Sequence, residues 1–190
     1  MTAGTALPDT RSRLLDTALK LLSEYGMEGT SLQMIADALG VTKATVYYHF
    51  RTKDELVQAI ASPPIQGLDQ LLDDALTRRS RSAQVDHALQ GLVDLIVRHR
   101  ALFGLINSDP GVRRVVQMTA RAGRVEDIKT KMIRVLAGEG PSLADALATH
   151  VVFAGLSVVG GDPAYAGIDD DVLRQHLLDV GRRLLGRPRR

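Results

Sequence analysis

Apolar side chains recur every three or four positions along most of this chain, which is the spacing of amphipathic helices. The first stripe, over residues 11–25, contains Leu15, Ala18, Leu22 and Tyr25. Gly26 is expected to end that helix. No segment of useful length alternates apolar and polar residues with the period of a strand. The pattern predicts an all-α protein with about nine or ten helices.

Two short helices joined by a tight turn are predicted between residues 31 and 50. Thr30 and Ser31 precede the first of them, where a hydroxyl can accept a hydrogen bond from an N–H group of the first turn. Gly40 is expected to end this helix because glycine tolerates a left-handed backbone, and Thr42 to cap the next. This order of elements is typical of a helix-turn-helix.

The second of these helices has one apolar side and one polar side. Val46 and Phe50 lie four residues apart and are predicted to face inward. Small residues near the start allow the N-terminus to enter a major groove, which is about 12 Å wide. The side chains expected to reach base edges are Lys43, Ala44, Thr45 and Tyr47. Tyr48, His49 and Lys53 are better placed for phosphates.

The same spacing also fits a plain helical hairpin whose tyrosines are half-buried in its core. Further along, a fourth helix is predicted to begin at Lys53 or Asp54. Ser62-Pro63-Pro64 is expected to kink or restart it, because proline lacks an N–H group and clashes inside a helix. One long helix is predicted over 112–137, and two final helices over 142–159 and 169–185.

Composition narrows the possible functions. The chain has 190 residues, of which 45% are hydrophobic, and it contains no cysteine. Disulfides and thiolate chemistry are therefore excluded, and a tight structural zinc site is not expected. The sequence has no HExxH or GxSxG pattern and no glycine-rich phosphate loop, so we expect no catalytic site, no metal and no cofactor.

Charge and hydropathy add two expectations. No signal peptide is visible, and no stretch approaches the ~18 apolar residues of a membrane span, so we expect a cytoplasmic protein without a membrane partner. The net charge is +2, but residues 1–60 hold six basic and seven acidic groups. Affinity for DNA would therefore depend on where the charges lie, and on two copies acting together.

The segment GTSLQMIADALGVTKATVYYHFRTKDELVQAI closely resembles the DNA-binding head of the TetR family of transcriptional regulators. The resemblance covers about residues 11–61 and includes Ile35-Ala36, Gly40-Val41, Tyr47-Tyr48-His49-Phe50 and Lys53-Asp54-Glu55-Leu56. It implies that Lys43, Ala44, Thr45 and Tyr47 face bases. It also implies that phosphates are held by Thr30, Ser31, Gln33, Tyr48, His49 and Lys53.

The same resemblance implies a DNA-binding domain over residues 1–61 and a ligand-binding and dimerisation domain over 62–190. A homodimer would use apolar stripes on the last two helices, made by Val151, Ala154, Val158, Leu173, Leu177, Val180 and Leu184. Alternatively, these stripes cover only the core of one chain. Candidates for a ligand cavity are His99, Phe103, Asn107, Met118, Arg121, His150 and Phe153, each of which also fits a purely structural role.

The hypothesis from the sequence is a regulator, acting as a repressor, that binds a palindromic operator as a dimer and leaves it when a small apolar or amphipathic effector binds. The alternative is a small-molecule binding module without specific DNA recognition. An enzyme with a helical body has no support from any motif.

Overall fold

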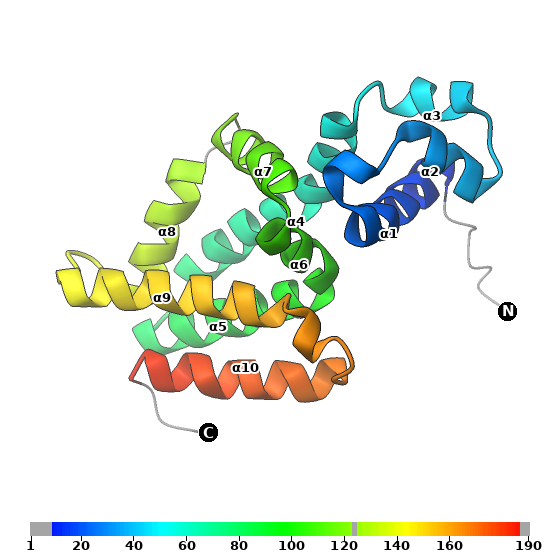
Figure 1. The fold of residues 1–190 in the computed structure, drawn as a ribbon. Coiled ribbons are helices and arrows are strands. Elements are labelled where there is room, and N and C mark those ends of the chain that lie inside the picture. The colour runs from blue at the N-terminus through cyan, green and yellow to red at the C-terminus, as the bar shows by residue number, and fades with distance from the viewer. Residues whose placement is uncertain (1–8, 123–124, 187–190) are drawn as a thin grey trace, which may run out of the picture.

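The computed structural model describes residues 9–122 and 125–186, and its regular elements are all helices (Figure 1). They are α1 (Thr10–Gly29), α2 (Leu32–Leu39), α3 (Lys43–His49), α4 (Lys53–Leu76), α5 (Arg81–Arg98), α6 (Arg100–Ser108), α7 (Pro110–Ala122), α8 (Val125–Ala137), α9 (Leu143–Gly160) and α10 (Asp170–Leu184), with a 3-10 turn η1 (Pro163–Tyr165) before α10. The all-α prediction is confirmed. Figure 1 shows α1–α3 grouped at one end and α8, α9 and α10 at the other.

The three N-terminal helices pack around one apolar cluster. Ala36 of α2 and Val46 of α3 are fully buried there, beside Leu14 of α1 and Leu56 of α4. Gly40 has a φ of 67° and lets the chain turn tightly between α2 and α3. These buried contacts hold α2 and α3 in the arrangement of a helix-turn-helix.

The expected break at Pro63-Pro64 does not end the fourth helix, because α4 runs from Lys53 to Leu76 with both prolines inside it. Two prolines remove two N–H groups and cost several kcal/mol in an isolated helix, roughly 3 each. Packing on both halves offsets this cost: Leu56 is buried among the N-terminal helices and Leu72 in the body. Local propensity is overridden by burial here.

The prediction of a single helix over 112–137 is wrong. The chain forms α7 and α8 instead, and residues 123–124 between them lie outside the described part. The two helices have different neighbours, since α7 packs mainly on α4 and α6 whereas α8 packs on α4, α5 and α9.

The expectation about membrane-length segments is also wrong for α9. Its 18 residues have a mean hydropathy of 1.6, so by length and composition alone this helix is apolar enough to cross a membrane. Asp145 and His150 interrupt the apolar run without offsetting its hydropathy. In the fold α9 packs on α5, α6, α8 and α10, and only 28% of the segment is buried. Much of its apolar surface therefore faces outward.

A second apolar cluster joins the N-terminal helices to the body. It contains Leu22 and Met27 from α1, Val57 from α4, Leu105 from α6 and Val112 from α7. A polar contact lies beside it. The carboxylate of Asp109 accepts hydrogen bonds from the backbone N–H of Met27 at 2.7 Å, of Gly111 at 2.8 Å and of Val112 at 3.0 Å.

Asp109 therefore both caps α7 and ties it to the end of α1. Gly26 has a φ of 70°, a conformation that glycine adopts without strain, and this turn directs the following N–H group toward the carboxylate. Burial raises the pKa of Asp109, but the three N–H donors and the nearby Lys53 outweigh it and hold the pKa below its ordinary value.

Asp109→Asn is expected to lower the free energy of unfolding by about 1–3 kcal/mol, because one carboxylate oxygen becomes an amide donor that faces an N–H group. Asparagine is a good N-cap, so the loss would fall on the contact with Met27. Urea denaturation at pH 7 measures the difference. Since the folded pKa is depressed, the stabilisation is complete above the ordinary pKa and disappears as the pH falls through the folded value. The difference between the two proteins should therefore narrow below about pH 4, and a constant difference would contradict the charge-assisted contact.

Candidate nucleic-acid interface and effector cavity

The outer face of α3 carries side chains that reach into solvent. The helix is fixed from its inner side, where Val46 is fully buried. On the other side Tyr47 is 43% and Tyr48 is 86% exposed, and Lys43 and Ala44 are exposed as well. The structure thus brings the predicted base-facing residues onto one accessible end of a short helix.

Contacts within α3 hold this end in place. The Oγ1 atom of Thr42 accepts a hydrogen bond from the N–H of Thr45 at 3.2 Å, and the two hydroxyls are 2.9 Å apart. The Nζ atom of Lys43 lies 5.4 Å from the centre of the Tyr47 ring, which is cation–π distance. The Thr45 hydroxyl is half-buried beside its cap, so of this group Lys43, Ala44 and Tyr47 project furthest.

Two of the predicted phosphate-binding residues are engaged inside the protein. Thr30 is 2% exposed, and its hydroxyl donates to the carbonyl of Gly26 at 2.8 Å. The Nζ atom of Lys53 donates to the carbonyl of Met27, at the junction of the N-terminal helices with the body. Sequence spacing does not reveal either partner, because both contacts depend on the turn at Gly26.

The remaining predicted phosphate-binding residues lie at the surface. Ser31 caps α2 and is exposed, as is Gln33, whose Nε2 atom donates to Asp37 at 2.7 Å. The rings of Tyr48 and His49 make an edge contact with centroids 5.1 Å apart at the C-terminal end of α3. These residues flank the exposed end of α3 from both sides of the turn.

A separate cavity of about 400 Å³ lies in the body, which is within the usual size of small-molecule sites. Its walls come from α4 to α9. They are mainly apolar and include Pro64, Leu68, Phe103, Met132 and Phe153.

The structure brings only some of the predicted cavity residues to this cavity. Phe103, Asn107 and Phe153 line it. Met118 is 58% exposed on α7, and His150 is exposed on α9. The side chain of Arg121 lies outside the described residues.

His99 lines a shallower hollow with Pro63, Gly91 and Asp94, between α4 and α5. Burial and the neighbouring Arg98 lower the pKa of His99 below its ordinary value. The imidazole is therefore a neutral group at this position near pH 7.

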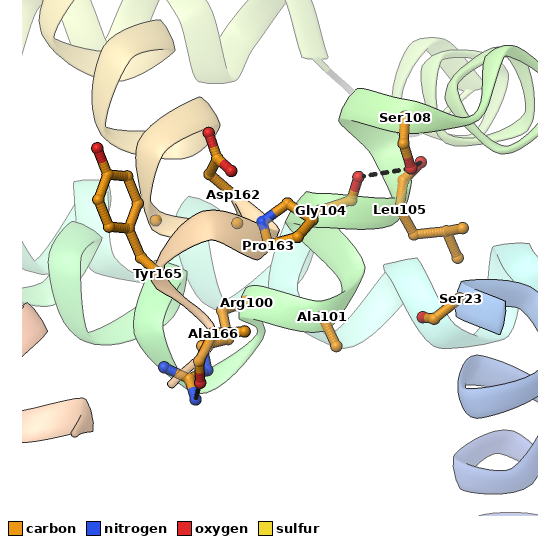
Figure 2. Close-up of a pocket in the computed structure, with 12 residues that line it drawn as sticks. Ser23, Arg100, Ala101, Gly104, Leu105, Ser108, Asp162, Pro163, Tyr165 and Ala166 are labelled. Atoms are coloured by element: carbon orange, nitrogen blue, oxygen red, sulfur yellow. Dashed lines mark hydrogen bonds between the residues drawn. The ribbon is translucent and has the colours of Figure 1, made fainter. Parts of the chain in front are cut away.

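The helix α6 separates the cavity from the N-terminal helices. Its Phe103 and Asn107 face the cavity, whereas Leu105 belongs to the cluster shared with α1. Figure 2 shows the opposite side of α6, where Arg100 and Gly104 meet the η1 segment across a hollow of about 260 Å³. Ser23 of α1 also lines this hollow, and α6 contacts both α1 and α9.

The backbones of α6 and the end of α9 are in direct contact at two glycines. A Cβ atom on Gly104 would lie 2.5 Å from the carbonyl oxygen of Gly161, and one on Gly161 would lie 2.4 Å from the nitrogen of Gly104. Only glycine allows this approach. Nothing in the spacing of the sequence indicates that these two glycines meet.

Gly104→Ala is expected to force α6 away from α9 and to lower the free energy of unfolding by about 1–3 kcal/mol, the usual cost of overpacking. Gly167→Ala is the matched control, since a Cβ atom there meets nothing within 4 Å. Thermal denaturation of both variants measures the effect. Equal melting temperatures for the two variants would show that α6 shifts without cost.

The predicted dimer residues divide into two groups. Leu173 and Leu177 are 5% and 4% exposed and belong to the core of the chain itself. The others lie at the surface, on α9 and α10: Val151, Ala154, Val158, Val180 and Leu184. Four further large apolar residues that the sequence stripes missed share these helices and are also exposed, namely Leu143, Leu147, Val159 and Val172.

Comparison with known proteins places this geometry in context. Residues 14–60 match the family model of bacterial regulatory proteins, tetR family. The HTH-type transcriptional regulator AcrR of Shigella flexneri is 46% identical over 52 residues, which are 27% of this chain and 24% of that protein. The chain thus spans about a quarter of that relative.

Two longer matches extend over the body. The HTH-type transcriptional regulator TcmR of Streptomyces glaucescens is 26% identical over 166 residues, 80% of this chain and 70% of that protein. The crystal structure of the TetR family transcriptional regulator PfmR from Thermus thermophilus has a TM-score of 0.69 and 24% identity, covering 97% of this chain and 100% of that chain. At this identity the likeness shows the fold.

Proposed function

We propose that this chain, a member of the TetR family of transcriptional regulators, represses transcription by binding a palindromic operator as a homodimer, and that a small apolar or amphipathic effector releases it. The observation that carries the proposal is the exposed end of α3, which is backed by buried Val46 and presents Lys43, Ala44 and Tyr47 together. Such a helix end fits a major groove.

The roles proposed for DNA contact follow from exposure. Lys43 and Tyr47 contact base edges, and the methyl group of Ala44 meets a thymine methyl. Thr45 positions the start of the helix through Thr42 and contacts a base from there. Phosphates are held by Ser31, Gln33, Tyr48 and His49, whereas Thr30 and Lys53 act within the protein.

Tyr47→Ala is expected to lower operator affinity about 5- to 150-fold, which corresponds to about 1–3 kcal/mol for one base contact. Affinity for a scrambled duplex of equal length should change little, since phosphate contacts remain. Fluorescence anisotropy at one fixed salt concentration measures both, with an operator selected from a random-sequence duplex pool.

Lys20→Ala is the control for this experiment, because Lys20 is an exposed cation on α1 at the side that faces α6. It should leave operator affinity unchanged. Equal losses on the operator and the scrambled duplex would contradict base contact by Tyr47. If the unaltered protein selects no sequence at all, the alternative function is favoured, a small-molecule binding module without specific DNA recognition.

Charge and exposed apolar surface support a homodimer through α9 and α10. The head is nearly neutral, so one copy gains little from the phosphate backbone. Val151 and Val158 are 58% and 49% exposed on α9, of which only 28% is buried within the chain. A symmetric partner would cover this surface and place two recognition helices about 34 Å apart, one turn of DNA.

Val151→Glu is expected to give a folded monomer whose operator affinity is lower by about 100-fold or more, because two linked heads gain about 10²–10⁴ over one. Sedimentation velocity and anisotropy on the same sample measure the two effects. Met118→Glu is the matched control, since Met118 is also 58% exposed but lies on α7. A dimer that persists in Val151→Glu with full affinity would contradict the interface.

We propose that residues 1–61 bind DNA and that residues 62–190 bind the effector and form the dimer. The protein would act in the cytoplasm. α4 belongs to both parts, since Val57 packs against α1 and Leu72 against the body. An effector that binds better to the DNA-free state lowers operator affinity by its difference in affinity for the two states. Displacement of α4 or α6 at the cavity wall changes the separation of the two α3 helices.

A further inference from the structure

One polar atom in the body has no hydrogen-bond partner among the described residues. It is the Oγ atom of Ser157, which is buried on α9, where the residue is 8% exposed. Buried hydroxyls nearly always have a partner, because leaving one unpaired costs free energy. Ser157 lines the 400 Å³ cavity. Its hydroxyl oxygen has less than 1 Å² of accessible surface and lies just behind the wall, so a rotation of the side chain about its Cα–Cβ bond would turn it toward the space that an effector would fill.

A neighbouring amide lies at the same wall. The Nδ2 atom of Asn107 on α6 donates to the backbone carbonyl of Ser157 at 3.4 Å. This contact fixes the amide beside the serine and joins α6 to α9. Ser157 and Asn107 are the polar residues of the inner wall, whose surface is almost wholly apolar and comes from side chains such as Phe103, Leu68 and Met132.

Charges are found at the rim of the cavity. Among the described side chains that line it, Lys129 is the charged one, and it is exposed, as is Gln117. An ionised group carried to the inner wall would lose its hydration without meeting an opposite charge, which costs several kcal/mol. A neutral group loses less and gains a hydrogen bond.

We infer that the cavity takes a neutral, predominantly apolar molecule with one hydrogen-bonding group, an alcohol or a ketone, and that this group pairs with the hydroxyl of Ser157. The inference rests on the effector role proposed above and specifies the ligand's chemistry. A hydroxyl both donates and accepts, so Ser157 serves either group. A single water molecule is a poorer occupant, because it needs two to four polar partners and these walls offer few.

The test uses the full-length protein with 1-decanol and decanoate, which share one chain length and differ in charge. Calorimetric titration is expected to give tighter binding of 1-decanol. Ser157→Ala should weaken binding of 1-decanol about 2- to 12-fold, the value of one neutral hydrogen bond, and should leave the weaker binding of decanoate unchanged.

The melting temperature of Ser157→Ala provides a second test, because a serine whose hydroxyl stabilised the fold by a hydrogen bond would lower the melting temperature when it is removed. Removal of an unpaired buried hydroxyl should raise the melting temperature of the free protein by about 2–4 °C. Ser62→Ala is the matched control, because the Ser62 hydroxyl already donates to the carbonyl of Gln58 at 2.7 Å and lies outside the cavity. This control should neither raise the melting temperature nor alter binding of 1-decanol.

Several outcomes would overturn the inference: no binding of 1-decanol, tighter binding of decanoate, or equal affinity for 1-decanol in Ser157→Ala and the unaltered protein. Failure of the proposed function looks different. It appears as an absence of sequence-selective DNA binding by the free protein, whatever the cavity binds. If 1-decanol binds through Ser157 without releasing DNA, the ligand chemistry is supported and the effector role alone fails.

Discussion

The burial of one face of α4, from its first turns to its last, is the constraint on which the other contacts depend. This helix contributes side chains to all four apolar clusters of the described residues, from Leu56 among the N-terminal helices to Leu72 in the body. The clusters bury α4 on both sides of the two prolines. This packing keeps α4 helical through Pro63 and Pro64, although two backbone N–H groups are lost there. Because a helix resists stretching, α4 is a stiff connection between the N-terminal helices and the body.

The junction between α1 and the body fixes how the N-terminal helices are oriented relative to the body. Apolar packing of Met27 and Val112 is directionless, but the hydrogen bonds from Met27 and Val112 to Asp109 fix one orientation. The contact from Lys53 to the carbonyl of Met27 adds a third restraint on the same turn. With these hydrogen bonds in place, the N-terminal helices would change position only by exchanging one set of hydrogen bonds for another. Such an exchange gives discrete arrangements, whereas a freely flexible link would not.

Local signals were enough to predict α2 and α3, whereas Gly26, which was expected to end the first helix, kinks it and α1 continues to Gly29. Caps and turns depend on a few adjacent residues, so Ser31, Gly40 and Thr42 marked α2 and α3 correctly, and Val46 was correctly placed inside. The predicted helix boundaries were wrong where contacts between residues far apart in the sequence determine where a helix ends. Pro63-Pro64 did not restart α4, and the segment 112–137 became two helices because its halves pack on different neighbours.

The candidate sites show the same limit. Exposure of Lys43 and Tyr47 follows from helix periodicity, whereas the burial of Thr30 depends on the backbone turn at Gly26, which helix periodicity does not reveal. Ser157 was not singled out, since a lone serine in an apolar helix has no signal of its own. Its significance appears only when the hydroxyl is found without a partner beside a cavity.

Some residues of α9 belong both to the cavity wall and to the exposed surface of the chain. Ala154 and Val158 line the cavity and are also exposed on the surface proposed for the partner. A partner helix packed there would close part of the cavity wall, so the shape of the site depends on the dimer. Thermodynamic linkage makes this coupling reciprocal. A ligand that binds the cavity more tightly in one dimer arrangement shifts the equilibrium toward that arrangement by the difference between its two binding free energies. If the proposed dimer sets the spacing of the two α3 helices, α9 would link occupancy of the cavity to DNA binding as directly as α4 would.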